Sequence, residues 1–315
     1  MRKYILRRLL LGIPAVFLMS LILFLLVNAL PGDIVERQLA GSGLTYEQLD
    51  QVKHDFGLDR PVLVQYFSWL GNLAVGDLGE SILTGRSVKD SLAQRAPATI
   101  QLGVLGLALA MLIAFPLGVI SAIRPNSVLD HVARFWALIG LAIPNFVVAI
   151  LFILLFSKYL GYFPGVGYTP PWDDPIESME RMWMPVVAIG TAQSASMARM
   201  IRSTLLEVLH SDYIRTAWAK GLRERMVVTR HAIKNALIPV VTIIGLQASS
   251  IIGGVVIIET IFTIPGMGQL LVISVSNRDL VPMQTVVLIF AIAVVFMNLL
   301  VDISYSWLDP RIRQT

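Results

Sequence analysis

Hydrophobic and polar positions are arranged along this chain in long blocks. Six stretches contain no charged side chain and have about the 20 residues that a bilayer core requires. In hydrocarbon a backbone must satisfy its own hydrogen bonds, and these stretches are too long for the strands of a membrane barrel. The pattern therefore predicts an all-α, polytopic membrane helix bundle. Its six expected transmembrane helices are residues 9–30, 100–123, 135–157, 182–198, 235–258 and 280–301.

A seventh uncharged stretch, residues 260–277, contains the sequence Pro265-Gly266-Met267-Gly268. Proline and glycine break a helix there, and the remainder is too short to cross the bilayer core. We therefore expect an interfacial or re-entrant segment. An even number of spans leaves both chain ends on one side of the membrane, whereas a seventh span would move the C-terminal end outside.

Lysine and arginine are distributed unequally between the two sides that the six spans define. Basic residues near span ends mark the cytoplasmic side. With the N-terminal end inside, the short outer loops hold only Lys158, Arg181 and Arg278, and acidic residues outnumber basic ones in the long outer segment 31–99. Both termini are therefore predicted to be cytoplasmic. The basic residues on that side are Arg2, Lys3, Arg7, Arg8, Arg124, Arg134, Arg199, Arg202, Arg215, Lys220, Arg223, Arg225, Arg230, Lys234, Arg311 and Arg313.

Composition narrows the function classes. Hydrophobic residues make up 56% of the 315 positions and charged residues only 15%, which indicates that lipid surrounds most of the chain. The formal net charge of +4 does not indicate a nucleic-acid partner, because the basic residues cluster between apolar runs. The absence of cysteine excludes disulfides, thiolate metal sites and a cysteine nucleophile.

The sequence contains no recognised catalytic motif. It lacks a Gly-x-x-x-x-Gly-Lys-Ser/Thr phosphate loop, a His-Glu-x-x-His zinc motif and a Gly-x-Ser-x-Gly nucleophile. No two of its four histidines have the i, i+4 spacing of a metal site. We therefore predict no catalytic residue, no metal site, no cofactor and no enzymatic activity in this chain.

The inner loop at residues 199–234 differs from the other polar segments, because its apolar residues recur at helical spacing among charges. Ser211 or Asp212 can cap a short helix over residues 213–220. Gly221 follows where a helix C-terminus favours a left-handed residue, and Lys220 is favourable against the helix dipole. The loop is therefore predicted to hold a short helix between two longer ones.

Several short motifs occur from one end of the chain to the other. They are Arg7-Arg8-Leu9-Leu10, Leu30-Pro31-Gly32-Asp33, Arg215-Thr216-Ala217, Lys220-Gly221, Arg230-His231-Ala232, Asn235-Ala236-Leu237-Ile238-Pro239, Glu259-Thr260-Ile261-Phe262-Thr263-Ile264-Pro265-Gly266-Met267-Gly268 and Leu308-Asp309-Pro310-Arg311-Ile312-Arg313. These motifs resemble those of permease subunits of the binding-protein-dependent ABC importers, in the dipeptide, oligopeptide and nickel branch. The N-terminal start and the long first outer loop are similar to those of the B-type permease of this branch.

The inner loop departs from the family's usual Glu-Ala-Ala pattern, since Arg215 and Thr216 stand at the Glu and first Ala positions. Further along, His231, Ile233 and Lys234 replace the usual Ile, Leu and Pro.

The resemblance implies that residues 212–221 form a coupling helix, which inserts into a groove on a separate ATPase subunit. The small residues Ala217 and Ala219 would then permit close approach of the partner. The alternative is a juxtamembrane loop that only holds anionic lipid through its arginines. The candidate coupling residues are Asp212, Tyr213, Arg215, Thr216, Ala217, Lys220 and Gly221.

Three polar side chains in or near the spans, Asn145, Gln247 and Glu259, are candidate pathway or gate residues. Polar groups in a bundle either line a path or join helices by hydrogen bonds, and the sequence leaves both alternatives open. For Glu259 the alternatives are a gate or binding-protein contact, and a carboxylate that caps the broken segment after it. Pro144 is expected to kink the third span.

Taken together, the resemblance implies a permease subunit of an ATP-driven importer in the bacterial inner membrane. Its expected partners are a second homologous permease, two ATP-binding ATPase subunits, a periplasmic or lipid-anchored solute-binding protein and the lipid bilayer. The expected substrate is a di- or oligopeptide, or a similar small solute, that passes between the two permeases. The alternative, an ion-coupled secondary transporter, normally needs ionisable groups at the bilayer midplane, and the six predicted spans contain none.

Overall fold

The computed structural model describes residues 2–29, 45–55, 57–163 and 165–308. In these ranges the chain is helical apart from turns, loops and one isolated bridge between Glu80 and Ser87, so the predicted all-α class is confirmed. The motifs at residues 30–33 and 309–313 lie outside the described residues. The helices are α1 (Arg2–Asn28), α3 (Tyr46–Asp55), α4 (Val62–Ala74), α5 (Val88–Ile123), α6 (Val128–Ala142), α7 (Asn145–Leu160), α8 (Pro175–Leu209), α9 (Asp212–Ala219), α10 (Glu224–Met226), the π-helix η1 (Val227–Ala232), α11 (Ile233–Ile261), α12 (Met267–Asn277) and α13 (Leu280–Leu308).

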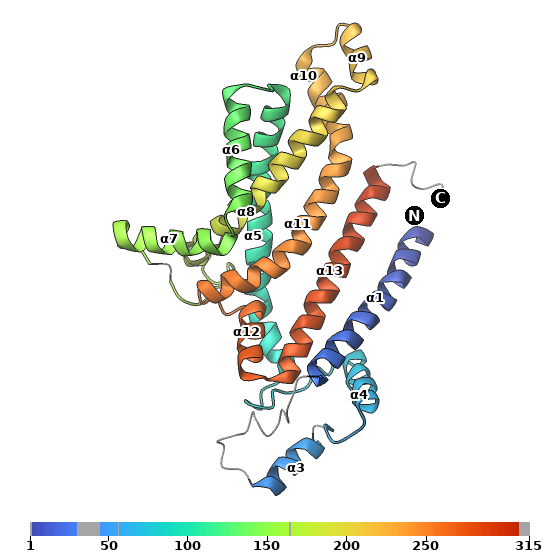
Figure 1. Cartoon of the computed structure of the whole chain (residues 1–315), viewed down its shortest axis with the longest axis vertical. Helices are drawn as coiled ribbons and strands as arrows, with labels where there is room; N and C mark the ends of the chain where they lie inside the picture. Colours follow the sequence, from blue (N-terminus) through green and yellow to red (C-terminus); the bar gives the residue numbers. More distant parts are fainter. Residues whose placement is uncertain (1, 30–44, 56, 164, 309–315) are drawn as a thin grey trace.

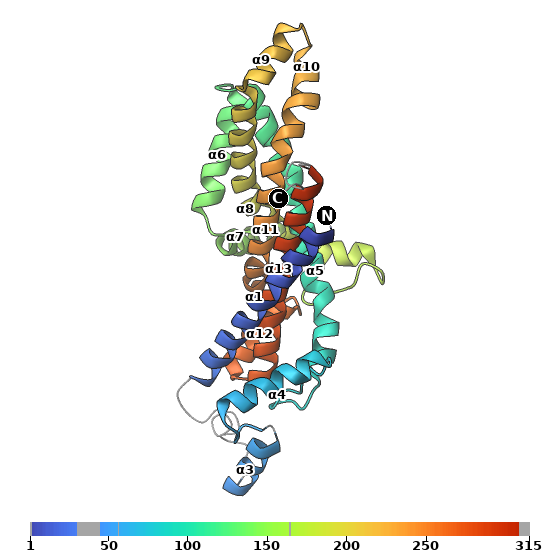
Figure 2. The same ribbon diagram turned by 90° about the vertical axis from the view of Figure 1, so that its right-hand side faces the viewer.

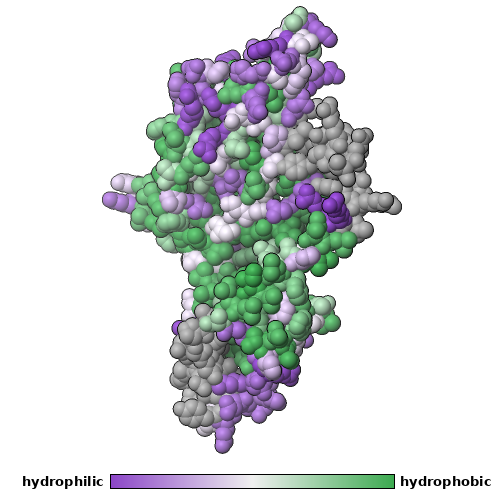
Figure 3. Space-filling model, turned by 45° about the vertical axis from the view of Figure 1, so that its right-hand side comes forward, coloured by the Kyte–Doolittle hydropathy of each residue, from purple (hydrophilic) through white to green (hydrophobic). Residues whose placement is uncertain are grey.

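Within the described part of the chain, α1, α5, α11 and α13 are long and apolar enough to cross a membrane. The pair α6 and α7 adds a fifth crossing if it is counted as one span. The remaining predicted span, residues 182–198, lies inside the more polar helix α8. Figure 3 shows hydrophobic side chains over the broad middle of the molecule and hydrophilic ones gathered at its two ends. This distribution is that of a polytopic membrane protein.

Helices α6 and α7 are bent by 98° relative to each other at Pro144. The residue before a proline is disfavoured in the helical region, and Ile143 is accordingly extended, with φ −101° and ψ 119°. Figure 1 shows α7 turned across the direction of its neighbours. The kink predicted at Pro144 is therefore present, and the stretch 135–157, expected to be one span, consists of two helices.

The centre of the bundle is the contact between α5 and α8, which is built on glycines. A Cβ atom added to Gly106 or Gly118 of α5 would lie within 2.9 Å of Ile189 or Ile201 of α8, respectively. In the opposite direction, a Cβ atom on Gly190 of α8 would lie 2.9 Å from Leu109 of α5. Small residues at such positions let helix backbones approach closely. The two helices therefore interlock at three levels.

The two ends of the molecule carry different elements. Figures 1 and 2 show α9 and α10 at one end and α3 and α4 at the other. The start of α1 and the end of α13 both point toward the end that carries α9 (Figure 1). Near the opposite end, α1 and α4 are joined by a buried hydrogen bond of 2.9 Å between Ser20 Oγ and Tyr66 Oη.

Helix α11 ends at Ile261 and α12 begins at Met267, so the break predicted at Pro265-Gly266 is confirmed. Thr263, between the two helices, adopts a left-handed conformation with φ 54°. The 11 residues of α12 extend about 16 Å, about half of the 30 Å thickness of a bilayer core. Helix α12 alone is therefore too short to span the membrane.

Candidate functional site

The C-terminal end of α9 is closed by the glycine that the sequence pointed to. The N–H of Gly221 donates to the carbonyl of Trp218 at 2.9 Å, and the N–H of Leu222 donates to the carbonyl of Ala217 at 3.4 Å. Gly221 has φ +73°, in the left-handed region. These features form a Schellman motif, which ends a helix and turns the chain away from its axis.

At the N-terminal end, the predicted side-chain cap is absent. Ser211 occupies the N-cap position, but its Oγ donates to the carbonyl of Val208 at 2.6 Å instead of accepting from α9. Asp212 is the first helical residue, where a negative charge is favourable against the helix dipole. Helix α9 covers Asp212–Ala219, so the helix predicted over residues 213–220 is confirmed to within one residue at each end.

One face of α9 is buried against the bundle. Ile214 is fully buried and Ala217 is nearly so. Both belong to a hydrophobic cluster that joins α9 to the ends of four other helical elements. The other buried members of this cluster are Ala122 of α5, Leu205 of α8, Val227 and Ala232 of η1 and Ala236 of α11. Ala217 therefore packs inward, and its small side chain serves the fit of α9 on the bundle rather than the approach of a partner.

The opposite face of α9 is open and carries both charge signs. The side chains of Asp212 and Arg215 are 98% and 71% exposed, and they lie 3.7 Å apart as an ion pair within the helix. Tyr213 is also exposed, and its Oη accepts a hydrogen bond of 2.9 Å from Asn235 Nδ2 of α11. Thr216 and Lys220 are exposed beside them. Most of the candidate coupling residues thus form one surface on a helix that is seated on the bundle.

The connection from α9 back to α11 contains an element that the sequence did not predict. Residues Val227–Ala232 form a π-helix, in which Val227, Val228 and Ala232 are buried. Such turns are rare and often lie at functional sites. No residue pattern distinguishes them from an α-helix of the same composition, which is why the element was missed.

Glu259, a candidate gate residue, is fully buried at the end of α11. Its Oε1 accepts a hydrogen bond of 2.6 Å from Thr99 Oγ1 of α5. Its Oε2 accepts from the backbone N–H of Gln269, in the first turn of α12, at 2.9 Å. A carboxylate at this place satisfies an N–H group that the helix itself leaves without a partner. The geometry thus matches the capping alternative for Glu259.

Two glycines of the same motif make room for this carboxylate. A Cβ atom on Gly266 would lie 2.2 Å from Glu259 Cδ, and one on Gly268 would lie 2.5 Å from the Cα atom of Val256. Thr99 adds a second link, because its Oγ1 also accepts from the N–H of Met267 at 2.8 Å. The motif from Glu259 to Gly268 therefore encodes a compact joint between α5, α11 and α12.

The other two candidate pathway residues lie at contacts between helices. Gln247 Nε2 of α11 donates to Ser196 Oγ of α8 at 2.7 Å. Asn145 begins α7, and its Nδ2 lies 3.1 Å from the position of a Cβ atom added to Gly254 of α11. These contacts correspond to the alternative in which polar groups join helices. Asn145, Gln247 and Glu259 therefore each take part in a separate contact of α11.

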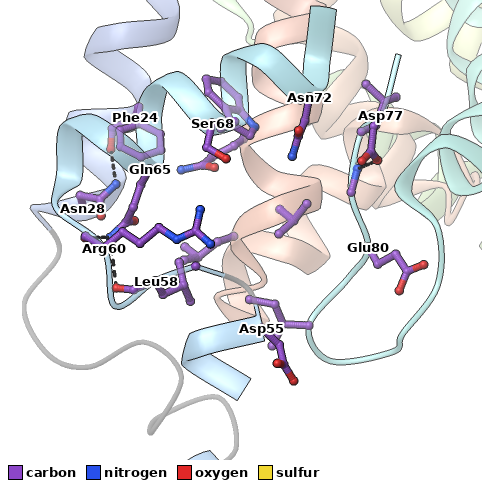
Figure 4. A pocket seen from close by; sticks show the side chains of 18 residues that line it. Phe24, Asn28, Asp55, Leu58, Arg60, Gln65, Ser68, Asn72, Asp77 and Glu80 are labelled. Atoms are coloured by element: carbon purple, nitrogen blue, oxygen red, sulfur yellow. Dashed lines mark hydrogen bonds between the residues drawn. The ribbon is translucent and has the colours of Figure 1, made fainter. Parts of the chain in front are cut away.

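A cavity of about 600 Å³ lies at the end of the molecule opposite α9, between α1, α4, α13 and the loop after α4. Figure 4 shows Arg60 reaching into it from one side, while Asp77 and Glu80 lie on the loop at the other side. Phe24 and Trp69 add aromatic surface. No local sequence pattern predicts this cavity, because its lining comes from α1, α3, α4, α13 and the loops on both sides of α4. The cavity offers both charge signs and aromatic faces to a solute on this side.

Two known families together match nearly the whole chain. Residues 114–314 match the family described as "Binding-protein-dependent transport system inner membrane component". Residues 1–103 match the family described as "Binding-prot-dependent transport system membrane comp, N-term".

Several curated proteins are similar over their full length. A putative peptide transport system permease protein of Brucella abortus is 40% identical over 313 residues, which cover 99% of each chain. The oligopeptide transport system permease protein AppB of Bacillus subtilis is 40% identical over 315 residues, again with 99% of each chain covered. The dipeptide transport system permease protein DppB of Alkalihalophilus pseudofirmus is 36% identical and covers 99% of this chain and 100% of its own.

Among solved structures, the fold is similar to that of a chain from the MetNI methionine ABC transporter in inward-facing conformations. The TM-score is 0.56 at 16% identity, with 70% of this chain and 96% of that chain covered. A chain from an amino acid ABC transporter gives a TM-score of 0.55 at 15% identity. These likenesses concern the fold. The two family matches and the full-length relatives show that the chain belongs to the binding-protein-dependent transport system inner membrane components. It is a multi-pass permease of the bacterial inner membrane, in a family whose ATP hydrolysis resides in separate subunits.

Proposed function

We propose that this permease imports di- or oligopeptides, or a closely similar small solute. The support is the similarity over full length to permeases whose names specify peptide, oligopeptide or dipeptide transport. In the proposed complex a second homologous permease completes the path, two ATPase subunits supply the energy, and a periplasmic or lipid-anchored binding protein delivers the solute. Family membership favours this importer over an ion-coupled secondary transporter.

The proposed topology has six spans and cytoplasmic termini. It counts α6 and α7 as one bent span and includes residues 182–198 of α8 beside the four long apolar helices. The directions of α1 and α13 in Figure 1 support it, since the start of one and the end of the other point toward the α9 end. The basic residues of the loops at that end support its placement in the cytoplasm.

The coupling role is supported by one observation: α9 has one face buried against the bundle and one exposed face. Its inner face, Ile214 and Ala217, is held by residues from α5, α8, η1 and α11. Its outer face presents Asp212, Arg215 and their neighbours to the cytoplasm. A push on the outer face is therefore delivered to four elements at once. We propose that closure of the ATPase subunits moves α9 in this way and switches the path between outward and inward access.

A cross-linking experiment tests this role. The chain has no native cysteine, so Thr216→Cys places one reactive group on the exposed face of α9. In the assembled complex this cysteine is expected to cross-link to an ATPase subunit, with a yield that changes when ATP is bound. Ile176→Cys, 73% exposed at the start of α8, is the matched control and should give no such product. Absence of cross-linking by Thr216→Cys in a complex that transports would refute the coupling role.

The topology has its own test. Arg215→Cys is expected to react with a membrane-impermeant maleimide only after the cells are permeabilised. Trp172→Cys, in the exposed loop before α8, is expected to react in intact cells. Labelling of both positions from the same side would contradict the proposed arrangement.

A further inference from the structure

The aspartate Asp130, at the α9 end of the bundle, is buried and does not belong to the exposed face of α9. Asp130 lies in the first turn of α6, and its side chain is fully buried. Arg202 of α8 binds it with two nitrogens, Nε at 2.7 Å from Oδ1 and Nη2 at 3.0 Å from Oδ2. This bidentate geometry is the strong form of an arginine–carboxylate pair, and it joins α6 to α8.

Three further groups complete the surroundings of Asp130. Ser121 of α5 donates its hydroxyl to Oδ1 and also accepts from Arg202 Nε at 2.9 Å. The backbone N–H of Asn126, in the loop between α5 and α6, donates to Oδ2 at 2.9 Å. Arg134, one turn further along α6, places Nη2 3.1 Å from Oδ2. The carboxylate thus gathers α5, α6, α8 and the α5–α6 loop at one point.

Through two helices, this ionic cluster adjoins the hydrophobic cluster in which α9 packs against the bundle. Ala122, the residue after Ser121 on α5, is buried in the cluster that contains Ile214 and Ala217. Leu205, three residues after Arg202 on α8, belongs to the same cluster. The inner ends of α5 and α8 therefore touch α9 on one side and hold Asp130 beside it. Helix α6 itself contributes no buried residue to the α9 cluster.

We propose that Asp130 is a positioning residue for transport, which fastens α6 to α5 and α8 so that a displacement of α9 also moves α6 and, beyond the bend at Pro144, α7. A buried charge that loses its partner is strongly unfavourable, so the cluster stays closed while the helices move. Without the ionic cluster, the push on α9 reaches α5, α8 and α11, but α6 follows only through its apolar contacts and one hydrogen bond of 3.0 Å from Trp136 Nε1 to Ser194 Oγ of α8. This inference rests on the coupling role proposed for α9.

The functional test uses Asp130→Asn in the fully assembled complex in proteoliposomes. The substitution keeps the shape of the side chain and removes its charge. We expect the number of ATP molecules hydrolysed per solute imported to rise about tenfold, within the range of usual allosteric couplings. A merely structural role would lower ATP hydrolysis and import together and leave this ratio unchanged. An unchanged ratio in Asp130→Asn would overturn the proposal.

The matched control is Glu177→Gln, because Glu177 also pairs with an arginine. Its Oε1 lies 2.5 Å from Arg181 Nη2, but both residues belong to α8 and the glutamate is partly exposed. This pair links no two helices, so its loss should leave the ratio of hydrolysis to import as it is in the natural sequence. A rise in Glu177→Gln equal to that in Asp130→Asn would also overturn the proposal.

A spectroscopic measurement separates this inference from the coupling proposal. Spin labels at Leu138→Cys of α6 and Met200→Cys of α8 occupy two exposed positions in a chain without other cysteines. We expect one narrow label distance that is equal in the nucleotide-free and ATP-bound complex. Adding Asp130→Asn should broaden it or make it depend on nucleotide. Failure of the coupling role of α9 would appear in the Thr216→Cys cross-linking, whereas failure of the fastening role would appear here.

Should Asp130→Asn fail to insert, Ser121→Ala takes its place in both measurements. It removes one hydrogen bond to Asp130 and leaves the pair with Arg202 intact. We then expect a smaller change in the same direction in the hydrolysis ratio and in the label distance. If Ser121→Ala has the same hydrolysis ratio and the same label distance as the protein without this substitution, the proposal is rejected.

Discussion

Gly221→Trp is expected to lower import by about tenfold or more while the protein still inserts in the membrane, in line with the usual size of allosteric coupling. Gly221 has φ +73°, and a side chain in this region costs about 1–2 kcal/mol. The strain opens the Schellman turn that ends α9. The position is open, with no atom within 4 Å of an added Cβ, so the indole would also project into the space that a partner occupies. Import and stimulated ATP hydrolysis by the reconstituted complex measure the effect.

Gly85→Trp is the matched control. Gly85 has φ +62° and equally open space around an added Cβ, but it lies before α5, at the end away from α9. It should therefore suffer the same strain without loss of coupling. Gly221→Asn separates the backbone strain from the bulk of the indole, because asparagine tolerates the left-handed region. Full import by Gly221→Trp would exclude α9 as the coupling element.

Glu259→Ala is expected to lower the free energy of unfolding by about 3 kcal/mol. The change leaves the N–H of Gln269 and the hydroxyl of Thr99 without their buried acceptor, and each unsatisfied buried group costs about 1–3 kcal/mol. Thermal unfolding in detergent micelles measures the loss. Gly268→Ala should act in the same direction, because its Cβ would press on the backbone of Val256.

Glu180→Ala is the control for this prediction, since Glu180 is exposed on α8 and should change stability little. The experiment also decides between the two roles considered for Glu259. A capping carboxylate gives lower stability in the isolated permease. A gate residue would instead leave stability unchanged and alter import alone, and that result would contradict the capping role.

The features that sequence reasoning recovered depend on neighbours along the chain. The end of the short helix at Gly221 follows from the local preference for a left-handed residue after a helix, although the side-chain cap expected at its start is absent. The break near Pro265 follows from proline geometry. The bend at Pro144 was expected for the same reason, but its size was not, because the angle depends on how α7 packs. The inward direction of Ala217 was missed, since small side chains suit either face of a helix.

The features that sequence reasoning did not recover join residues far apart in the chain. Thr99 and Glu259 are separated by 160 positions, and Ser121 and Arg202 by 81. Nothing in the local pattern around Asp130 specifies Arg202 as its partner among the many arginines of the inner loops. Glu259 was left between two roles because the N–H group that it accepts from becomes its neighbour only after α12 folds back.

The glycines between α5 and α8 also determine which parts of the permease can move. Ile189 and Ile201 of α8 occupy the hollows at Gly106 and Gly118. A Cβ atom at Gly118 would already lie 2.8 Å from Ile201, so a slide of one helix along the other by as little as about 1.5 Å, the rise of one residue, would take Ile201 out of this hollow. The pair therefore keeps a fixed register, and the transport cycle displaces α5 and α8 together as one body rather than one along the other.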